Sequence, residues 1–155
     1  MTCNDVLGRL RYIFDYGDAD MVAIFAAADH AATEEQVRHW LVDEENPLFA
    51  KLYDRELATF LNGLINHKRG KRPGPSPVPE NRLTNNLIAT KLKIALNLKG
   101  EDILDIMGLV RFRLSKHELS SFFRKPDHKH YRDCKDQILR NFLKGLQLKY
   151  RPVPE

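Results

Sequence analysis

Cysteine is scarce in this chain, and long apolar runs are absent from it. Cys3 and Cys134 are the only cysteines among 155 residues, which argues against a disulfide framework and favours two free thiols. The longest apolar candidate, Met21 to Ala28, falls well short of the roughly 18 to 20 residues that a membrane span requires. Four aspartates precede it, whereas a secretory signal begins with basic residues. We therefore expect a cytoplasmic protein that does not associate with membranes.

Sequence signatures of enzymes are also missing. The chain has no Gly-rich phosphate loop, no H-E-x-x-H motif and no G-x-S-x-G motif. No convincing alternation of apolar and polar residues predicts a strand, so we expect an all-α fold. With 43% apolar residues, the chain can form one domain or two small ones. These absences favour a binding protein that is not an enzyme and uses no cofactor.

What the sequence does contain is an internal repeat with an offset of 82 residues. Without a gap, residues 4–69 align with residues 86–151, and 11 of the 66 pairs are identical. About four identities are expected by chance, at roughly 6% per position. We predict a tandem duplication of one helical unit, with the first repeat at residues 1–69, a Pro-rich linker at 70–85, the second repeat at 86–151 and a tail at 152–155. The linker prolines favour an extended, semi-rigid spacer.

Each repeat is predicted to contain four helices. Asn4 and Asn86 are good N-cap residues for the first helix of each repeat. The third helix opens with the capping-box pattern, a hydroxyl residue followed three positions later by Gln or Glu, at residues 33–36 and 115–118.

The fourth helix of each repeat shows the strongest apolar periodicity, over about residues 54–66 and 136–149. Gly63 and Gly145 lie at the same place inside it, as FLNGL and FLKGL. Glycine costs about 1 kcal/mol relative to alanine within a helix. Its presence in both repeats therefore predicts that another helix approaches closely there.

The segment FFRKPDHKHYRDCKD contains two histidines and a cysteine. His128, His130 and Cys134 have the spacing of three zinc ligands, but His117 is the only further ligand nearby. The first repeat has leucines, four residues apart, in place of His130 and Cys134. Side chains four apart share one face of a helix, so we expect His130 and Cys134 to be partly buried packing residues. We therefore expect an inert thiol and no metal site.

The two repeats differ most in charge. Residues 4–69 contain 7 Lys and Arg against 12 Asp and Glu, a net charge of −5, whereas residues 86–151 contain 15 against 7, a net charge of +8. A basic surface of this kind is typical of polyanion binding, most plausibly of RNA or DNA. The candidate residues are Arg124, Lys125, His128, Lys129, Arg132, Arg140, Lys144 and Arg151. The last three are spaced by four and seven, which predicts one line along the fourth helix.

Other interpretations remain open. The basic repeat can complement the acidic one, as a protein-interaction module or a homo-oligomer, or it can be a solvated face. A helix-turn-helix over residues 101–125 is a further possibility, although its connection, roughly residues 108–114, is longer than that motif uses. It would expose Lys116, His117, Ser120, Ser121 and Arg124. An enzyme acting on a small anion would need a pocket where Asp136, His128 or His130 converge.

Three stretches of the sequence suggest a family: NGLINHKRGK, NNLIATKLKIALNLKGEDIL and LSKHELSSFFRKPDHKHYRDCKDQILRNFLKGL. In them the chain resembles the bacterial YehS-like family, small cytoplasmic proteins built from a duplicated domain of unknown function. The resemblance covers nearly the whole chain and implies a two-copy helical protein. It supplies no catalytic or ligand residues. Residues 124–129 match the family pattern R-K-P-D-H-K, which is consistent with a ligand or partner surface there.

Overall fold

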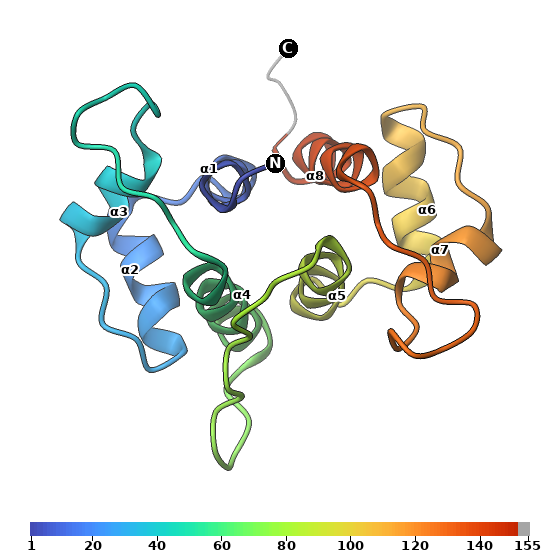
Figure 1. The fold of residues 1–155 in the computed structure, drawn as a ribbon, viewed down its shortest axis with the longest axis horizontal. Helices are drawn as coiled ribbons and strands as arrows, with labels where there is room; N and C mark the ends of the chain where they lie inside the picture. The colour runs from blue at the N-terminus through green and yellow to red at the C-terminus, as the bar shows by residue number, and fades with distance from the viewer. Residues whose placement is uncertain (152–155) are drawn as a thin grey trace. The chain divides into compact units, whose positions relative to one another are not determined.

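The structure, a computed structural model, describes residues 1–151, and these residues form helices and loops without strands (Figure 1). The helices are α1 (Cys3–Phe14), α2 (Asp18–Ala27), α3 (Glu34–Leu41), α4 (Asp54–Arg69), α5 (Asn85–Ala95), α6 (Gly100–Leu109), α7 (Lys116–Phe122) and α8 (Asp136–Tyr150). They form two compact units, Met1–Leu83 and a second unit that begins at Thr84. The predicted all-α tandem duplication of a four-helix unit is confirmed. The predicted tail at 152–155 lies outside the described residues.

No helix among residues 1–151 combines the length and the apolar character that crossing a bilayer would take.

Both units follow the same backbone path. Asp15 and Asn97, with φ of 56° and 53°, follow the first helix of their units in the left-handed conformation. Asp29 and Arg111, with φ of 60° and 56°, follow the second helix in the same way. Asp and Asn adopt this conformation more readily than most residues, whereas it is uncommon for arginine. Because each pair is separated by the repeat offset, the repeat in the sequence is also a repeat of the backbone.

Hydroxyl side chains begin the first and third helices of each unit. Thr2 and Thr84 cap α1 and α5. Thr33 and Ser115 each accept a hydrogen bond, at 3.0 Å, from the amide three residues later. The Gln or Glu side chain at that later position accepts a bond from the Thr33 or Ser115 amide in return. The predicted capping boxes are confirmed, and they fix where α3 and α7 begin.

The prediction that Asn4 and Asn86 are N-caps is wrong. Both residues lie inside the first turn of their helices, and their side chains reach across the unit. Nδ2 of Asn86 donates to the carbonyls of Phe122 at 3.1 Å and Arg132 at 2.8 Å, and its Oδ1 accepts from the amide of Cys134 at 2.9 Å. Asn4 makes the three equivalent bonds at 2.9, 2.9 and 3.0 Å. Each asparagine therefore joins the first helix to the end of the third and to the loop that follows it.

The glycines of α4 and α8 lie where the second helix of each unit crosses the fourth. A Cβ atom added to Gly145 would lie 2.6 Å from the carbonyl oxygen of Ile106, and one added to Gly63 would overlap that of Ile24. Real Cβ atoms essentially never approach a heavy atom within 3.0 Å. The predicted close approach is confirmed, and α2 packs on α4, and α6 on α8, backbone against backbone.

Residues 70–83, the larger part of the predicted linker, are tied to the first unit. Nζ of Lys71 lies 2.9 Å from Oδ1 of Asp29, and the Ser76 hydroxyl donates to Oδ2 of Asp29 at 2.7 Å. Ser76 and Lys71 together hold the pKa of Asp29 below its ordinary value. The amide of Leu83 donates to Oδ2 of Asp54 at 2.8 Å. The segment is non-helical, as its prolines predict, but these polar contacts make it part of the first unit.

Candidate functional site

The loop between α7 and α8, residues 124–135, contains five of the eight candidate residues, and we call it the basic loop. Two tight turns shape it. The amide of His128 donates to the carbonyl of Lys125, and the amide of Tyr131 donates to that of His128, both at 2.9 Å. Asn86 fixes the far end of the loop through two of its three hydrogen bonds. Main-chain hydrogen bonds therefore hold the loop in place, independently of its charged side chains.

The first unit has the same loop at residues 42–53, which we call the acidic loop. Its turns are closed by the equivalent bonds, from the amide of Asn46 to the carbonyl of Asp43 and from the amide of Phe49 to that of Asn46, both at 2.9 Å. The acidic loop contains three acidic residues and one basic residue, whereas the basic loop contains five basic and two acidic. One backbone conformation thus displays opposite charge in the two units.

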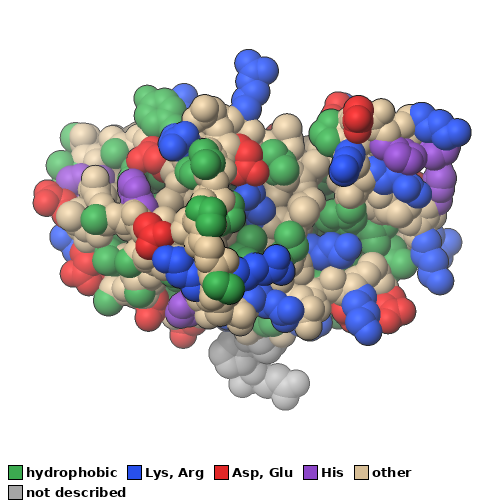
Figure 2. Space-filling view, turned by 90° about the horizontal axis from the view of Figure 1, so that it is seen from below, with side chains coloured by type: hydrophobic (Ala, Val, Ile, Leu, Met, Phe, Trp, Pro, Cys, Tyr) green, Lys and Arg blue, Asp and Glu red, His purple; other side chains and the backbone are tan. Residues whose placement is uncertain are grey.

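The cations of the basic loop face solvent and are not paired with carboxylates. Within residues 1–151, five exposed side chains of this loop form no ion pair: Arg124, Lys125, Lys129, Arg132 and Lys135. Arg11 and Arg38 of the first unit, in contrast, lie 2.8 and 3.6 Å from the carboxylate of Asp18. Figure 2 shows Lys and Arg side chains of the second unit around a group of histidines. An uncompensated positive surface of this kind attracts anions.

Helix α8 contributes two further exposed cations, Arg140 and Lys144, which are four residues apart and so share one helix face. The predicted continuation of this line to Arg151 is wrong. Helix α8 ends at Tyr150, and Arg151 is a half-buried C-cap residue with φ of −139°. Its backbone therefore leaves the helical path, and the line consists of Arg140 and Lys144.

Three histidine rings gather at the basic loop. The centroid of the His130 ring lies 5.5 Å from that of His128 and 6.0 Å from that of His117 in α7. Nδ1 of His128 accepts the amide of His130 at 3.0 Å, just as Oδ1 of Asn46 accepts the amide of Leu48 at 2.9 Å. His128 therefore helps to form the turn. Residues 1–151 contain no group of three or more His, Cys, Asp or Glu side chains that could hold a metal ion.

The prediction that His130 is a partly buried packing residue is wrong. His130 is exposed, and Leu48 at the equivalent position is 59% exposed. Four-residue spacing does not place these side chains on one face because the segment consists of turns and extended chain, without a helix. Cys134 is 6% exposed, and its burial was predicted correctly.

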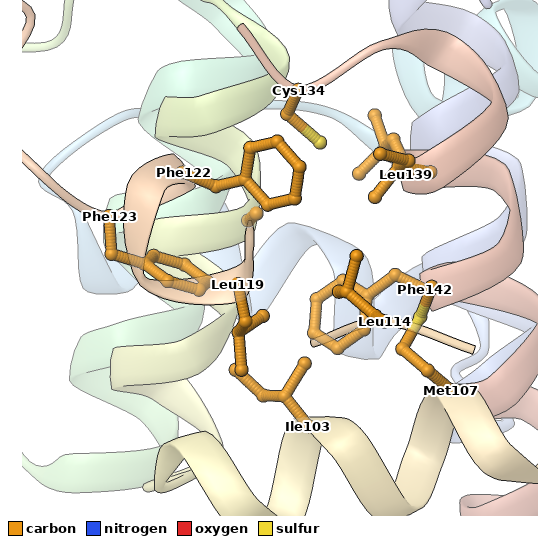
Figure 3. Close-up of a pocket in the computed structure, with 11 residues that line it drawn as sticks. Ile103, Met107, Leu114, Leu119, Phe122, Phe123, Cys134, Leu139 and Phe142 are labelled. Atoms are coloured by element: carbon orange, nitrogen blue, oxygen red, sulfur yellow. The ribbon is translucent and has the colours of Figure 1, made fainter. Parts of the chain in front are cut away.

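Cys134 points into a small apolar cavity of the second unit (Figure 3). The cavity has a volume of about 20 Å³, and the sulfur is directed between Phe122 and Leu139. Burial raises the pKa of the Cys134 thiol to about 11, and the negative charge of Asp136 adds to the effect. The thiol is therefore protonated near neutral pH and lacks the thiolate form that a nucleophile needs.

The side chains around this cavity differ in size from those of the first unit. Four buried residues of the first unit, Leu7, Phe25, Trp40 and Leu52, correspond to Ala89, Met107, Phe122 and Cys134 around the cavity. Three other lining residues, Leu114, Leu119 and Phe123, are larger than Ala32, Val37 and Leu41 of the first unit, so the same backbone frame is filled differently in the two units.

We expect Cys134→Val to stabilise the second unit by about 0.5 to 1 kcal/mol, because the added methyl group fills apolar space. Cys134→Ala should destabilise it by about 1 to 2 kcal/mol, because the substitution enlarges the cavity. Urea unfolding followed by circular dichroism measures both changes. Equal free energies of unfolding for the two variants would contradict the cavity as their cause.

The helix-turn-helix alternative loses support from the geometry. The connection between α6 and α7 spans residues 110–115, longer than the three or four residues of that motif. Ser121, expected on the exposed face, is 1% exposed, and its hydroxyl donates to the carbonyl of Glu118. The expectation for Ser121 is wrong because this side of α7 faces the core. The other four residues expected on that face are exposed: Lys116, His117, Ser120 and Arg124.

Sequence reasoning missed a groove between α5, α6 and α7 with a volume of about 520 Å³. Three cations and one carboxylate are among the residues that line it: Lys93, Lys116, Arg124 and Glu101. The repeat alignment contained a signal for it, since Gly100 stands opposite Asp18 of the first unit. The carboxylate side chain that the first unit has at this position is therefore absent from the second unit, where glycine lies at the edge of the groove.

Comparison with known proteins agrees with the duplicated architecture. The family described as "Protein of unknown function (DUF1456)" matches residues 3–70 and again residues 85–151. The chain is 45% identical over 147 residues to the uncharacterized protein YehS of Escherichia coli (strain K12), and the alignment covers 94% of each chain. No solved structure matches the chain. The resemblance to the YehS-like family is thereby confirmed, and the chain belongs to the DUF1456 family, whose domain it contains twice.

Proposed function

We propose that this protein is a non-enzymatic, cytoplasmic binding protein that binds RNA or DNA through the basic loop and helix α8. The contrast between the two loops supports the proposal, since they share a backbone conformation and carry opposite charge. Arg11 and Arg38 are paired with a carboxylate of their own unit. The five exposed cations of the basic loop form no such pair within residues 1–151, so a negatively charged partner outside the chain accounts for them best.

A chain of phosphates suits this surface. Each phosphate that a Lys or Arg neutralises releases condensed counterions, so affinity rises with the number of contacts and falls with added salt. The five loop cations, together with Arg140 and Lys144, can make such contacts. Contacts to phosphate position a nucleic acid but do not read its sequence. We therefore expect binding with little sequence preference from this surface alone.

Replacing two loop cations, Lys125→Ala with Lys129→Ala, is expected to weaken the salt dependence of binding. If both side chains contact phosphate, the slope of log affinity against log salt should flatten by up to about 1.4 for a single strand and about 1.8 for duplex DNA. Fluorescence anisotropy with labelled single-stranded RNA, hairpin RNA and duplex DNA, at low and near-physiological salt, measures the slope.

The matched control is Arg72→Ala with Arg82→Ala, which removes the same charge from exposed positions of the first unit. Both double variants should keep their stability to within about 0.5 kcal/mol, because all four side chains are exposed. The same slope in the two variants would mean that net charge drives the binding and that the basic loop is the wrong surface.

A protein-interaction module is the second candidate function. In it, the acidic loop of one molecule meets the basic loop of another, or the basic loop meets a different acidic protein. Loops of one shape and opposite charge are complementary in potential, which favours specific association. Both candidate functions predict sensitivity to salt, so molecular mass distinguishes them. A dimer that forms at low salt without nucleic acid, and dissociates at higher salt, would favour this candidate.

A further inference from the structure

An ion pair stands in the first unit where the second unit has its groove. Asp18, at the start of α2, lies 2.8 Å from Arg11 in α1 and 3.6 Å from Arg38 in α3. The contact of Oδ1 of Asp18 with Arg11 is not aligned as a hydrogen bond, so the attraction is one of charge. The Asp18 side chain is only 23% exposed. A largely buried carboxylate thus holds the first three helices of this unit together.

The second unit has a cation at one of the two arginine positions of this cluster and lacks the Asp18 carboxylate. Lys93 stands in place of Arg11, Ser120 in place of Arg38, and Gly100 in place of Asp18. At the charged positions around the groove, the first unit has two cations and two carboxylates, whereas the second has three cations and one carboxylate. The net charge of the region therefore changes from 0 to +2, and the space of one carboxylate is vacated.

The lining of the groove also includes apolar side chains, one of them an aromatic ring. Leu104, Leu119 and Phe123 line it, and Nζ of Lys93 lies 4.8 Å from the centre of the Phe123 ring. A ligand in the groove therefore meets both cations and apolar side chains. The volume of about 520 Å³ falls within the roughly 300 to 1,000 Å³ of small-molecule sites.

We propose that the groove holds one nucleotide of a single-stranded RNA or DNA, with its phosphate where the first unit has the Asp18 carboxylate. The inference rests on the proposed function, because Arg124 belongs both to the groove and to the basic loop. A phosphate accepts charge-assisted hydrogen bonds from Lys93, Lys116 and Arg124. The attached base packs against the apolar lining residues, as unpaired bases do on aromatic side chains. A duplex keeps its bases paired and offers none to the groove.

Gly100→Asp tests this subsite, because it restores the carboxylate of the first unit. A Cβ atom at Gly100 would meet Cδ2 of Leu119 at an ordinary 3.8 Å, so the variant should fold. The control is Gly108→Asp, which adds the same charge to the same helix at an exposed position with nothing within 4 Å of the added Cβ. Fluorescence anisotropy compares both variants with the unaltered protein, using a labelled single-stranded RNA and a duplex DNA, each about 12 nucleotides long.

We expect Gly100→Asp to bind the single strand at least about ten-fold more weakly than Gly108→Asp, which corresponds to loss of one stacked nucleotide. The duplex should be bound equally by the two variants. Lys116→Glu, which copies Glu34 of the first unit, alters the groove from another helix and should reproduce the selective loss.

Two other outcomes separate the subsite from the proposed function. An equal loss in the two glycine variants for both probes overturns the subsite and leaves the nucleic-acid function standing. If the unaltered protein binds neither probe, both the subsite and the function are overturned.

Discussion

Gly145→Ala is expected to destabilise the second unit by about 2 kcal/mol, and Gly63→Ala should destabilise the first unit by more, although alanine is the better helix former. The added methyl group meets a main-chain carbonyl of the crossing helix, at 2.6 Å for Gly145 and Ile106. A backbone oxygen cannot rotate away as a side chain can, so the two helices must separate. Overpacking of a core costs about 1 to 3 kcal/mol, and occasionally more. The higher helix propensity of alanine offsets only about 1 kcal/mol of this. Urea unfolding of each variant measures the change.

Gly108→Ala is the control for this prediction, since it makes the same substitution in α6 where an added Cβ meets nothing within 4 Å. It should stabilise the protein by up to about 1 kcal/mol through helix propensity alone. The sign of the effect is therefore opposite at Gly108 and Gly145. If Gly145→Ala were as stabilising as Gly108→Ala, the backbone contact between α6 and α8 would be wrong.

Asn86→Ala is expected to cost about 3 kcal/mol and to loosen the basic loop. The substitution removes two hydrogen bonds to carbonyls and one from an amide, and it leaves those three main-chain groups without their partner. A buried polar group left unsatisfied costs about 1 to 3 kcal/mol, and three such groups at the lower end of this range give about 3 kcal/mol. Hydrogen exchange at the amide of Cys134 should also become faster, since Asn86 protects it. Urea unfolding and amide exchange measure the two effects.

Asn141→Ala provides the comparison. Asn141 is half-buried, and its side chain donates one hydrogen bond, to the carbonyl of Gln137 in its own helix. Its loss should cost less than about 1 kcal/mol. A similarly small loss for Asn86→Ala, with unchanged exchange at Cys134, would show that the loop is held by other contacts.

The capping boxes could be predicted from the sequence, whereas the role of Asn86 could not. In a capping box the two partners stand three residues apart, so a local pattern contains both. The partners of Asn86 are 36, 46 and 48 residues away. An asparagine before an apolar helical pattern resembles an N-cap in either case, and only the folded chain shows that the cap is the preceding threonine.

The glycine contacts and the basic surface were predictable for a different reason. Aligning the two repeats shows both features directly: the glycine occurs in both repeats, and the net charge differs between them. The exposure of a side chain cannot be read from the aligned sequence in this way. His130 was predicted to be partly buried because a helical spacing was assumed, whereas its segment forms turns. The groove escaped prediction because it arises from a missing side chain, at Gly100, whose effect depends on three helices meeting there.

The asparagine anchors also bear on how a duplicated gene can diverge. Because one asparagine side chain positions each loop through hydrogen bonds to its main chain, the outward residues of the loop can mutate at little cost in stability, usually within about 0.5 kcal/mol each. An ancestral loop can then pass from acid to base by single substitutions, with every intermediate still folded. The backbone of the loop can thus be conserved while the charge of its surface changes. One repeat can then acquire a new surface charge while the other keeps the original one.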